Sequence, residues 1–377
     1  MSRYNNPTGH ENAGRARQSK RLSAAGLTAA LAAFLLVGCA PQAQEQEASQ
    51  ARVATSFWKI GSEYDADRPG YRILYEGKKM RHCYPVTAWF GGYGEDDYHA
   101  LHHHGVAVES ELMAYRLYFD KKQTVDVYCK RTPRLELAES CWYPNDQLLA
   151  EHYGDDILRV GGTIGVGSVN YWRDGKIRHF KEVGERQQWI VEQNDSMAVI
   201  EVSDIDWTVP DEHMDDVDKR LMVNFSAKYT MCAGHRDMRC DVRVSKPIHG
   251  LCTGVQAIPN KGFKEDSEWI SERLPNGVLL ASWGTDWPVN DTAKYAKETV
   301  GLGVFIPKKY AGKQVQNDYN NLCLLRCLLQ RTDSAHPERA GAHFYLTCVG
   351  ATKEDQPVAT TAAEWFDYLR QWAETLD

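Results

Sequence analysis

Apolar and polar residues alternate one by one over several stretches of the chain. The clearest alternating runs lie at 221–231, 240–245 and 300–306. Because successive side chains of a strand point to opposite faces, this period of two indicates half-buried strands. Turn dipeptides lie between such runs, at Asp174-Gly175 and Asn276-Gly277, and both supply the positive φ angles of tight hairpins. Many hairpins with little helix predict an all-β fold, and the length favours a large two-sheet sandwich.

One segment near the C-terminus has helical spacing instead. Thr361 and Glu364 match a capping box, in which each side chain bonds the backbone of the other residue. Apolar residues then recur on one helical face, at Trp365, Phe366, Leu369, Trp372 and Leu376. We expect an amphipathic helix here that docks on the sheets.

The N-terminus is ordered like a bacterial export signal. A basic region at 15–21 precedes an apolar run at 27–37. That run is shorter than the roughly 20 residues that a spanning helix needs, and it has the length of a signal-peptide core. Its ending, Leu36-Val37-Gly38-Cys39, resembles the bacterial lipobox, in which the cysteine thiol is acylated. The alternative is an ordinary secretory signal with an incidental cysteine.

This N-terminal pattern divides the chain into three parts. We expect a signal peptide at 1–38, a lipid anchor and flexible tether at 39–56, and one β-sandwich carbohydrate-active domain at 57–377. The tether lacks apolar periodicity, so it cannot offset the entropy lost on ordering. The predicted location is the outer membrane, as a lipoprotein that is held through Cys39 and faces the periplasm or the cell surface.

Charge and aromatic content narrow the class of partner. The net charge is −7 and no basic stripe appears, so the chain lacks the electrostatic footprint of nucleic-acid binding. The 11 Trp and 19 Tyr residues suit contact with sugars, although most of them will fill a β-rich core. We therefore expect an oligosaccharide or polysaccharide partner and no nucleic acid.

A cluster of histidines lies at His99, His102, His103 and His104. It has three readings, which are a metal site, an acid–base or substrate contact, and a solvated loop. His102 and His104 share parity and could hold a divalent cation, but no third ligand is spaced to help. No metal site and no other cofactor is therefore assigned.

The run from Val106 to Asp120 is rich in apolar and aromatic residues and predicts one strand. Alternation along a single strand places Glu109 and Arg116 on opposite faces, where they should not meet unless a bulge intervenes. A cation in such a run costs free energy unless it is paired or solvated in a cleft. Arg116 is therefore either a clamp for a substrate carboxylate or an ion-pair partner of a carboxylate on a neighbouring strand.

Three ordered segments share a wider pattern. Val108–Tyr118 is similar to Trp-Glu-Asn-Asp-x-Ile-Ala-Phe-Arg-x-Tyr, Val125–Thr132 to Ile-Asp-Val-Trp-x-Lys-Arg-Thr, and Tyr153–Gly167 to Gly-x-Gly-Leu-Asp-x-Tyr-x-Val-Gly…Gly-Cys-Gly. These are signatures of domain-of-unknown-function family 4861, which the chain resembles over about residues 70–375. The chain departs from the pattern at three positions, which are Val108, Phe119 and Arg159.

The resemblance carries expectations about fold and activity. It implies a β-supersandwich of the galactose-mutarotase type, exported by bacteria that degrade complex polysaccharides. It also implies elimination chemistry on acidic sugars. Glu109 and Arg116 carry over as the charged positions of the first signature.

Elimination requires a base, a cation that neutralises the substrate carboxylate, and an acid for the leaving oxygen. His104, Arg116 and Tyr118 have these chemical types, and Glu109 completes the predicted catalytic set. Hydrolysis of a glycosidic bond instead needs two suitably spaced carboxylates. The candidates for such a pair are Glu109, Glu111 and Asp286.

Substrate contacts are predicted in the third signature and in two rim loops, at Asp156, Arg159, His235, Trp283, Asp286 and Trp287. Two tryptophans beside an aspartate suit sugar stacking, although a turn with core-facing tryptophans is the alternative. The predicted function is a carbohydrate-active lyase or dehydratase for uronate-containing oligosaccharides. A glycoside hydrolase and a non-catalytic glycan-binding lipoprotein remain the alternatives.

Overall fold

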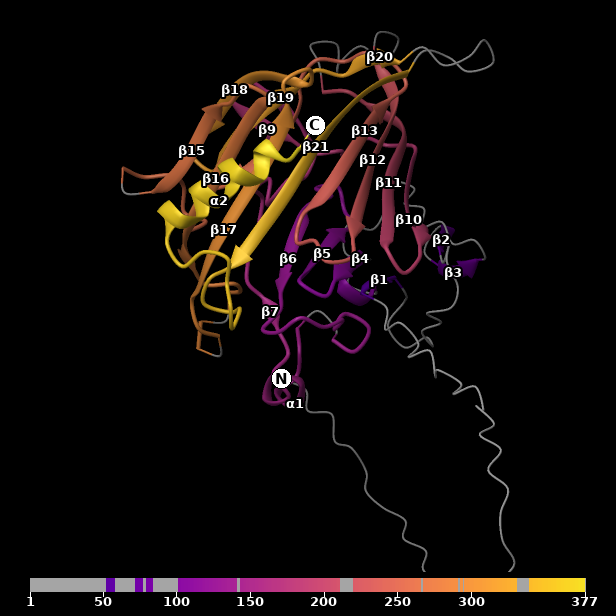
Figure 1. Ribbon diagram of the computed structural model, residues 1–377. Helices are drawn as coiled ribbons and strands as arrows, with labels where there is room; N and C mark the ends of the chain where they lie inside the picture. Colours follow the sequence, from indigo (N-terminus) through magenta and orange to yellow (C-terminus); the bar gives the residue numbers. More distant parts are fainter. Residues whose placement is uncertain are drawn as a thin grey trace, which may run out of the picture. The chain divides into compact units, whose positions relative to one another are not determined.

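The alternating runs of the sequence fold into antiparallel strands that form three sheets (Figure 1). The computed structural model describes residues 52–57, 72–76, 79–83, 101–140, 143–210, 220–265, 267–290, 292–293, 295–330 and 339–376. The predicted signal peptide, Cys39 and His99 lie outside these residues. No helix within the described ranges is long and apolar enough to cross a membrane.

The largest sheet has eleven strands. Ten of them follow one another in the order β15 (Glu268–Arg273), β16 (Gly277–Asp286), β17 (Glu298–Pro307), β21 (Arg339–Gly350), β13 (Met238–Val244), β12 (Met222–Cys232), β11 (Met197–Thr208), β10 (Glu185–Gln193), β2 (Arg72–Glu76) and β3 (Lys79–Cys83). The eleventh, β20 (Leu328–Gln330), pairs with β21. Strand β21 joins the two halves of this sheet, because it pairs with β17 on one side and β13 on the other.

Two five-stranded sheets complete the β structure. One has the order β1 (Val53–Ser56), β4 (Gly105–Ser110), β5 (Met113–Tyr118), β6 (Val125–Cys129) and β7 (Asp155–Asp156). The other has the order β18 (Ala311–Asn317), β19 (Asn320–Leu325), β14 (Leu251–Gln256), β8 (Asn170–Arg173) and β9 (Lys176–Arg178). Within the described residues, the helical elements are η2 (His102–His104), α1 (Asp146–Ala150) and α2 (Ala362–Glu374), and only α2 is longer than five residues.

The main core contains side chains from all three sheets. It includes Val108 of the β1–β7 sheet, Val255 of the β18–β9 sheet, and Val242 of the large sheet. In β12 the alternation is plain, since Phe225 is buried while Asn224 is exposed. One face of the large sheet therefore packs against both smaller sheets. This confirms the prediction of an all-β, sandwich-like fold with period-two strands.

The predicted C-terminal helix is confirmed as α2, which begins at the capping box. The Thr361 side chain accepts a hydrogen bond from the Glu364 amide, and the Glu364 carboxylate accepts one from the Thr361 amide. Trp365 and Leu369 are fully buried in a second core, on the other face of the large sheet from the main core. Strands β16 and β17 are therefore covered on both faces.

Two glycines of β17 let α2 approach the sheet closely. A Cβ atom at Gly301 would lie 2.7 Å from Nε1 of Trp365, and one at Gly303 would lie 2.5 Å from the Leu369 side chain. The indole Nε1–H of Trp365 donates to the Leu302 carbonyl at 3.2 Å. The missing side chains thus create the space in which the Trp365 ring is seated.

Candidate functional site

The segment that predicted one strand at Val106–Asp120 folds instead as the hairpin of β4 and β5. Residues Glu111 and Leu112 form its turn, so Ala107 lies opposite Arg116 and Glu109 lies opposite Ala114. The prediction that Glu109 and Arg116 lie on opposite faces is therefore wrong. A two-residue turn reverses the chain and returns both side chains to the same face.

The turn contains no glycine or asparagine and is stabilised instead by the side chain of Ser110. The Ser110 hydroxyl accepts from the Leu112 amide at 3.1 Å and donates to the His235 carbonyl. Odd positions of β5, such as Tyr115, enter the main core, whereas even positions point to the other side of the sheet. We call that side the polar face, and it carries Glu109, Arg116, Tyr118, Asp126 and Asp156.

Arg116 is the centre of a buried charge cluster on the polar face. Its Nη2 atom donates to Oδ2 of Asp126 at 2.5 Å and also to Oδ2 of Asp156. The Tyr118 hydroxyl donates to the same Asp126 oxygen at 2.9 Å. Arg116 and Asp126 are each 1% exposed and Asp156 is 3% exposed. Strands β5, β6 and β7 thus each contribute to one network, which brings together three predicted residues: Arg116, Tyr118 and Asp156.

Burial and like charge set the protonation of this network. Desolvation raises the pKa of Asp156, the neighbouring Asp126 raises it further, and Arg116 opposes the shift. Desolvation and Asp126 likewise raise the pKa of Tyr118. Tyr118 therefore keeps its proton and points it at Asp126, while Asp156 is the carboxylate most ready to accept a proton.

His104 and Tyr143 flank this network. The ring of His104 meets that of Tyr118 edge to face, with the centroids 5.3 Å apart. Burial and the nearby charge of Asp156 raise the pKa of Tyr143, and Arg116 opposes the shift; the residue is 38% exposed. The network therefore combines buried acid–base groups with an aromatic ring at the surface.

The histidines of η2 are buried, so the reading as a solvated loop is wrong for the three of them that the structure describes. His103 and His104 have positive φ angles of 58° and 62°, which turn the chain sharply. His103 hydrogen-bonds the Leu137 carbonyl through Nε2 at 2.7 Å. Within the described ranges, no three His, Cys, Asp or Glu side chains are grouped as a metal centre would require.

His102 should make the protein sensitive to acid. Burial lowers its pKa to about 3, below the ordinary value of 6.5. Between these values the unfolded chain binds a proton that the folded protein does not, so stability is lost as the pH falls below 6.5. We expect His102→Gln to reduce the pH slope of the unfolding free energy by up to about 1.4 kcal/mol per pH unit.

The measurement is urea denaturation at several pH values between neutrality and the acid limit of folding. His249→Gln is the matched control, because His249 is exposed. An unchanged slope in the His102 variant would show that another group causes the acid sensitivity.

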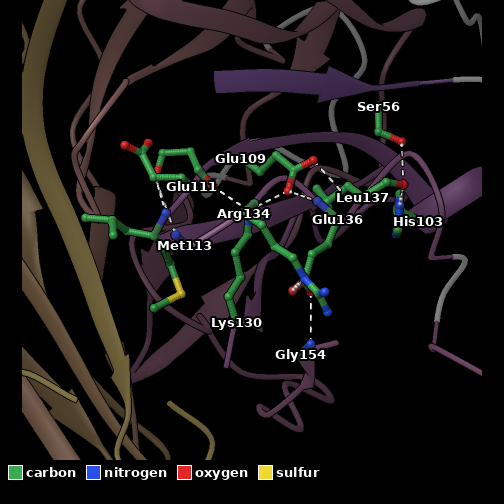
Figure 2. A network of polar contacts seen from close by, with 12 residues as sticks. Ser56, His103, Glu109, Glu111, Met113, Lys130, Arg134, Glu136, Leu137 and Gly154 are labelled. Atoms are coloured by element: carbon green, nitrogen blue, oxygen red, sulfur yellow. Dashed lines mark hydrogen bonds and ion pairs between the residues drawn. The ribbon is translucent and has the colours of Figure 1, made fainter. Parts of the chain in front are cut away.

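Glu109 is held in a different set of contacts on the same face (Figure 2). Its carboxylate accepts from Nζ of Lys130 at 2.5 Å, from the Glu136 amide at 2.8 Å and from the Leu137 amide at 2.9 Å. Lys130 also donates to the carbonyl of Arg134 at 2.6 Å. The side chains of Lys130 and Glu109 are only 1% and 2% exposed, and their contacts anchor residues 130–137.

The network continues through Glu136 (Figure 2). Its carboxylate accepts from Nε of Arg134 at 2.8 Å and from the Gly154 amide at 2.9 Å. The three segments that resemble the family signatures therefore contact one another. Val108–Tyr118 contacts Val125–Thr132 through the Glu109–Lys130 pair, and it contacts Tyr153–Gly167 through Arg116 and Asp156. Segments that are separate in sequence form one connected structure.

The sequence profile of the family described as Domain of unknown function (DUF4861) matches residues 42–377. The chain belongs to the DUF4861 family. No curated protein matches it.

The other predicted residues of this DUF4861 protein lie in two further places. Asp286 accepts from the Asn260 amide at 2.7 Å, and its Oδ2 lies 3.6 Å from Nη2 of Arg159. Trp287, the next residue, is partly exposed, and Nζ of Lys297 lies 5.8 Å from its ring. Trp283 is 5% exposed and lies in the core beneath α2, so its prediction as a sugar contact is corrected to a core position.

His235 lies apart from these groups, in the turn between β12 and β13. Its side chain is 58% exposed, and Nδ1 lies 3.2 Å from Oδ1 of Asp237. Asp126 was not predicted from the sequence, although a carboxylate between two valines of a strand, Val125 and Val127, was a usable signal. Tyr143 was not predicted either, because no local pattern distinguishes it from a core aromatic residue.

Proposed function

We propose that this DUF4861 protein eliminates across a bond of uronate-containing oligosaccharides, as a lyase or dehydratase. The observation that carries the proposal is the buried network of Tyr118, Asp126, Arg116 and Asp156. His104 lies in ring contact with it. Buried acid–base groups with shifted pKa values beside a surface aromatic ring are typical of catalytic sites.

The chemistry requires two proton transfers. A base removes the proton beside the uronate carboxylate, the bond to the leaving oxygen breaks, a carbon–carbon double bond forms, and an acid protonates that oxygen. Tyr118 is assigned the acid, because it is the protonated hydroxyl of this network. His104 is the imidazole beside it and fits the base.

Arg116 has a positioning role in this proposal rather than the direct clamp suggested by its sequence. Both of its aspartate partners already occupy Nη2. With Asp156 protonated, as its raised pKa favours, the cluster of Arg116, Asp126 and Asp156 carries no net charge. An anionic substrate then meets no repulsion from the cluster.

Hydrolysis is less well supported by the candidate carboxylates. Glu109 is bound by Lys130 and two backbone amides. Glu111 pairs with Arg52 and accepts from the Gly234 amide, whereas Asp286 lies beside Arg159. These carboxylates belong to separate sets of contacts, so they do not form the facing pair that glycosidases use.

The experiment is incubation with a panel of acidic and neutral polysaccharides and oligosaccharides. Ultraviolet absorbance from a new conjugated double bond reports elimination, and reducing ends without that absorbance report hydrolysis. Binding without any product would support the non-catalytic glycan-binding alternative. Elimination on acidic glycans alone is the result we expect.

Tyr118→Phe should lower the turnover by about a hundredfold, the lower end of what general acid–base catalysis contributes. The fold should be retained, because one hydrogen bond is worth about 1 kcal/mol. Initial rates and thermal unfolding are measured on the same samples. Tyr319→Phe is the control, since Tyr319 is 46% exposed in the turn between β18 and β19. Full turnover in the Tyr118 variant would move the reaction away from this network.

The proposal also places the protein at the outer membrane, anchored through Cys39. Its support is the ending Leu36-Val37-Gly38-Cys39 after a short apolar run. An acidic oligosaccharide would then be met on the periplasmic or the outer side of that membrane. Metabolic labelling of the intact chain with a palmitate analogue tests the anchor.

A further inference from the structure

A cavity with a volume of about 630 Å³ lies beside Lys130, at the end of strand β6. Its walls come from five places, which are Leu112 in the β4–β5 turn, the loop after β6 at Lys130–Pro133, the turn at Gly234–Asp237, the loop after β21 at Glu354–Val358, and Tyr368 of α2. This volume is in the range of small-molecule sites.

Two of the three cations in its walls are already paired. Lys130 binds Glu109 at 2.5 Å. Arg236 holds Glu354 through two hydrogen bonds, at 3.0 and 3.2 Å. Each of these two cations is already neutralised by a carboxylate in contact with it, so neither is available to pair with a bound anion.

Arg131 is different from these two cations. Within the part of the chain that the structure describes, its guanidinium forms no hydrogen bond and no ion pair, and its Nε atom is buried. Its backbone is fixed, because the Arg131 carbonyl accepts from the Asp355 amide at 3.0 Å. The guanidinium charge of Arg131 therefore has no counter-ion among the described residues, and an anion bound in the cavity would supply one.

The other groups that line the cavity favour a sugar that carries a single negative charge. His235 is oriented by Asp237 through Nδ1, which leaves Nε2 to bond a hydroxyl group. Tyr368 lines the cavity and stacks on Trp365, with the ring centroids 5.3 Å apart. The carboxylates of Asp237, Glu354 and Asp355 also line it, so they oppose a doubly charged anion such as phosphate more strongly than a singly charged one.

We propose that this cavity binds a uronate sugar unit, whose carboxylate pairs with Arg131 and whose hydroxyl bonds His235. The guanidinium fork of arginine matches a carboxylate in two parallel hydrogen bonds. This binding site is additional to the polar face. It does not depend on the proposed elimination, because occupancy is measured without turnover.

The test is protection of His235 from acylation by diethyl pyrocarbonate, followed by peptide mass spectrometry. The probe is glucuronate, and the comparison ligands are glucose and inorganic phosphate. Glucuronate should slow acylation of His235 and leave His249, which is exposed and outside the cavity, unaffected. Glucose and phosphate should protect His235 much less.

Arg131→Gln should raise the glucuronate concentration that gives half-protection by about tenfold or more, because a charge-assisted hydrogen bond is lost. Arg243→Gln, at an exposed position outside the cavity, should leave that concentration unchanged. Thermal unfolding checks that both variants are folded. Equal protection in the Arg131 variant overturns the proposal. In the unaltered protein it is also overturned by no protection with glucuronate, or by equal protection with glucose or phosphate.

Discussion

Lys130→Ala is expected to lower the free energy of unfolding by about 3–5 kcal/mol, because removing one partner of a buried ion pair leaves the other charge uncompensated. Glu109 is 1% exposed and would keep only two amide donors, those of Glu136 and Leu137. The carbonyl of Arg134 would also lose a donor. Chemical denaturation monitored by tryptophan fluorescence measures the change.

A double-mutant cycle separates the pair from other effects of the substitution. In a Glu109→Gln background, Lys130→Ala should reduce the free energy of unfolding clearly less than it does alone, because no buried carboxylate is then left without a partner. Lys246→Ala, at an exposed position, should change stability by less than about 0.5 kcal/mol. Equal costs of Lys130→Ala in both backgrounds would show that the ion pair does not hold this region together.

Trp365→Ala should also destabilise the protein by about 3–5 kcal/mol, the usual cost of deleting a large buried aromatic side chain. The ring is fully buried over Gly301, and its Nε1–H donates to Leu302. Removal leaves a cavity between α2 and β17 and deletes the hydrogen bond from the indole to the Leu302 carbonyl. Denaturation midpoints give the change, and Val191→Ala at a 42% exposed strand position is the control.

Gly301→Ala tests the geometry behind this prediction. Alone it should destabilise, because the added Cβ would lie 2.7 Å from Nε1 of Trp365. Combined with Trp365→Ala it should cost little or nothing further, since the methyl group then occupies empty space. If the losses of unfolding free energy from Gly301→Ala and Trp365→Ala simply add in the double variant, the Trp365 ring does not pack against Gly301.

The sequence predicted those parts of the fold that depend on local signals. Strand β12 and helix α2 were both identified, because strict alternation and a capping box act within a few residues. The β4–β5 hairpin was missed because its turn, at Glu111 and Leu112, depends on the Ser110 hydroxyl instead of on a positive-φ residue. An apolar run without a recognisable turn residue is predicted as one continuous strand.

The candidate site was predictable in residue type and only partly in arrangement. Arg116, Tyr118 and Asp156 do meet, but the sequence could not show that Asp126 and Asp156 both hold the guanidinium. Lys130 and Arg131 are neighbours in the sequence and both line the cavity, yet Lys130 is paired with Glu109 while Arg131 has no partner among the described residues. Pairing depends on which distant segments the fold brings together, and a single sequence does not reveal those contacts.

The place of β21 in the large sheet has a consequence for how the chain acquires its structure. β21 pairs with β17 on one edge and with β13 on the other, and β13 ends at Val244, far before β21 begins at Arg339. Until β21 is in place, β13 and β17 each present an edge that can recruit another chain. Pairing between strands so distant in sequence is slow, so these edges are exposed for longer than those of a local hairpin.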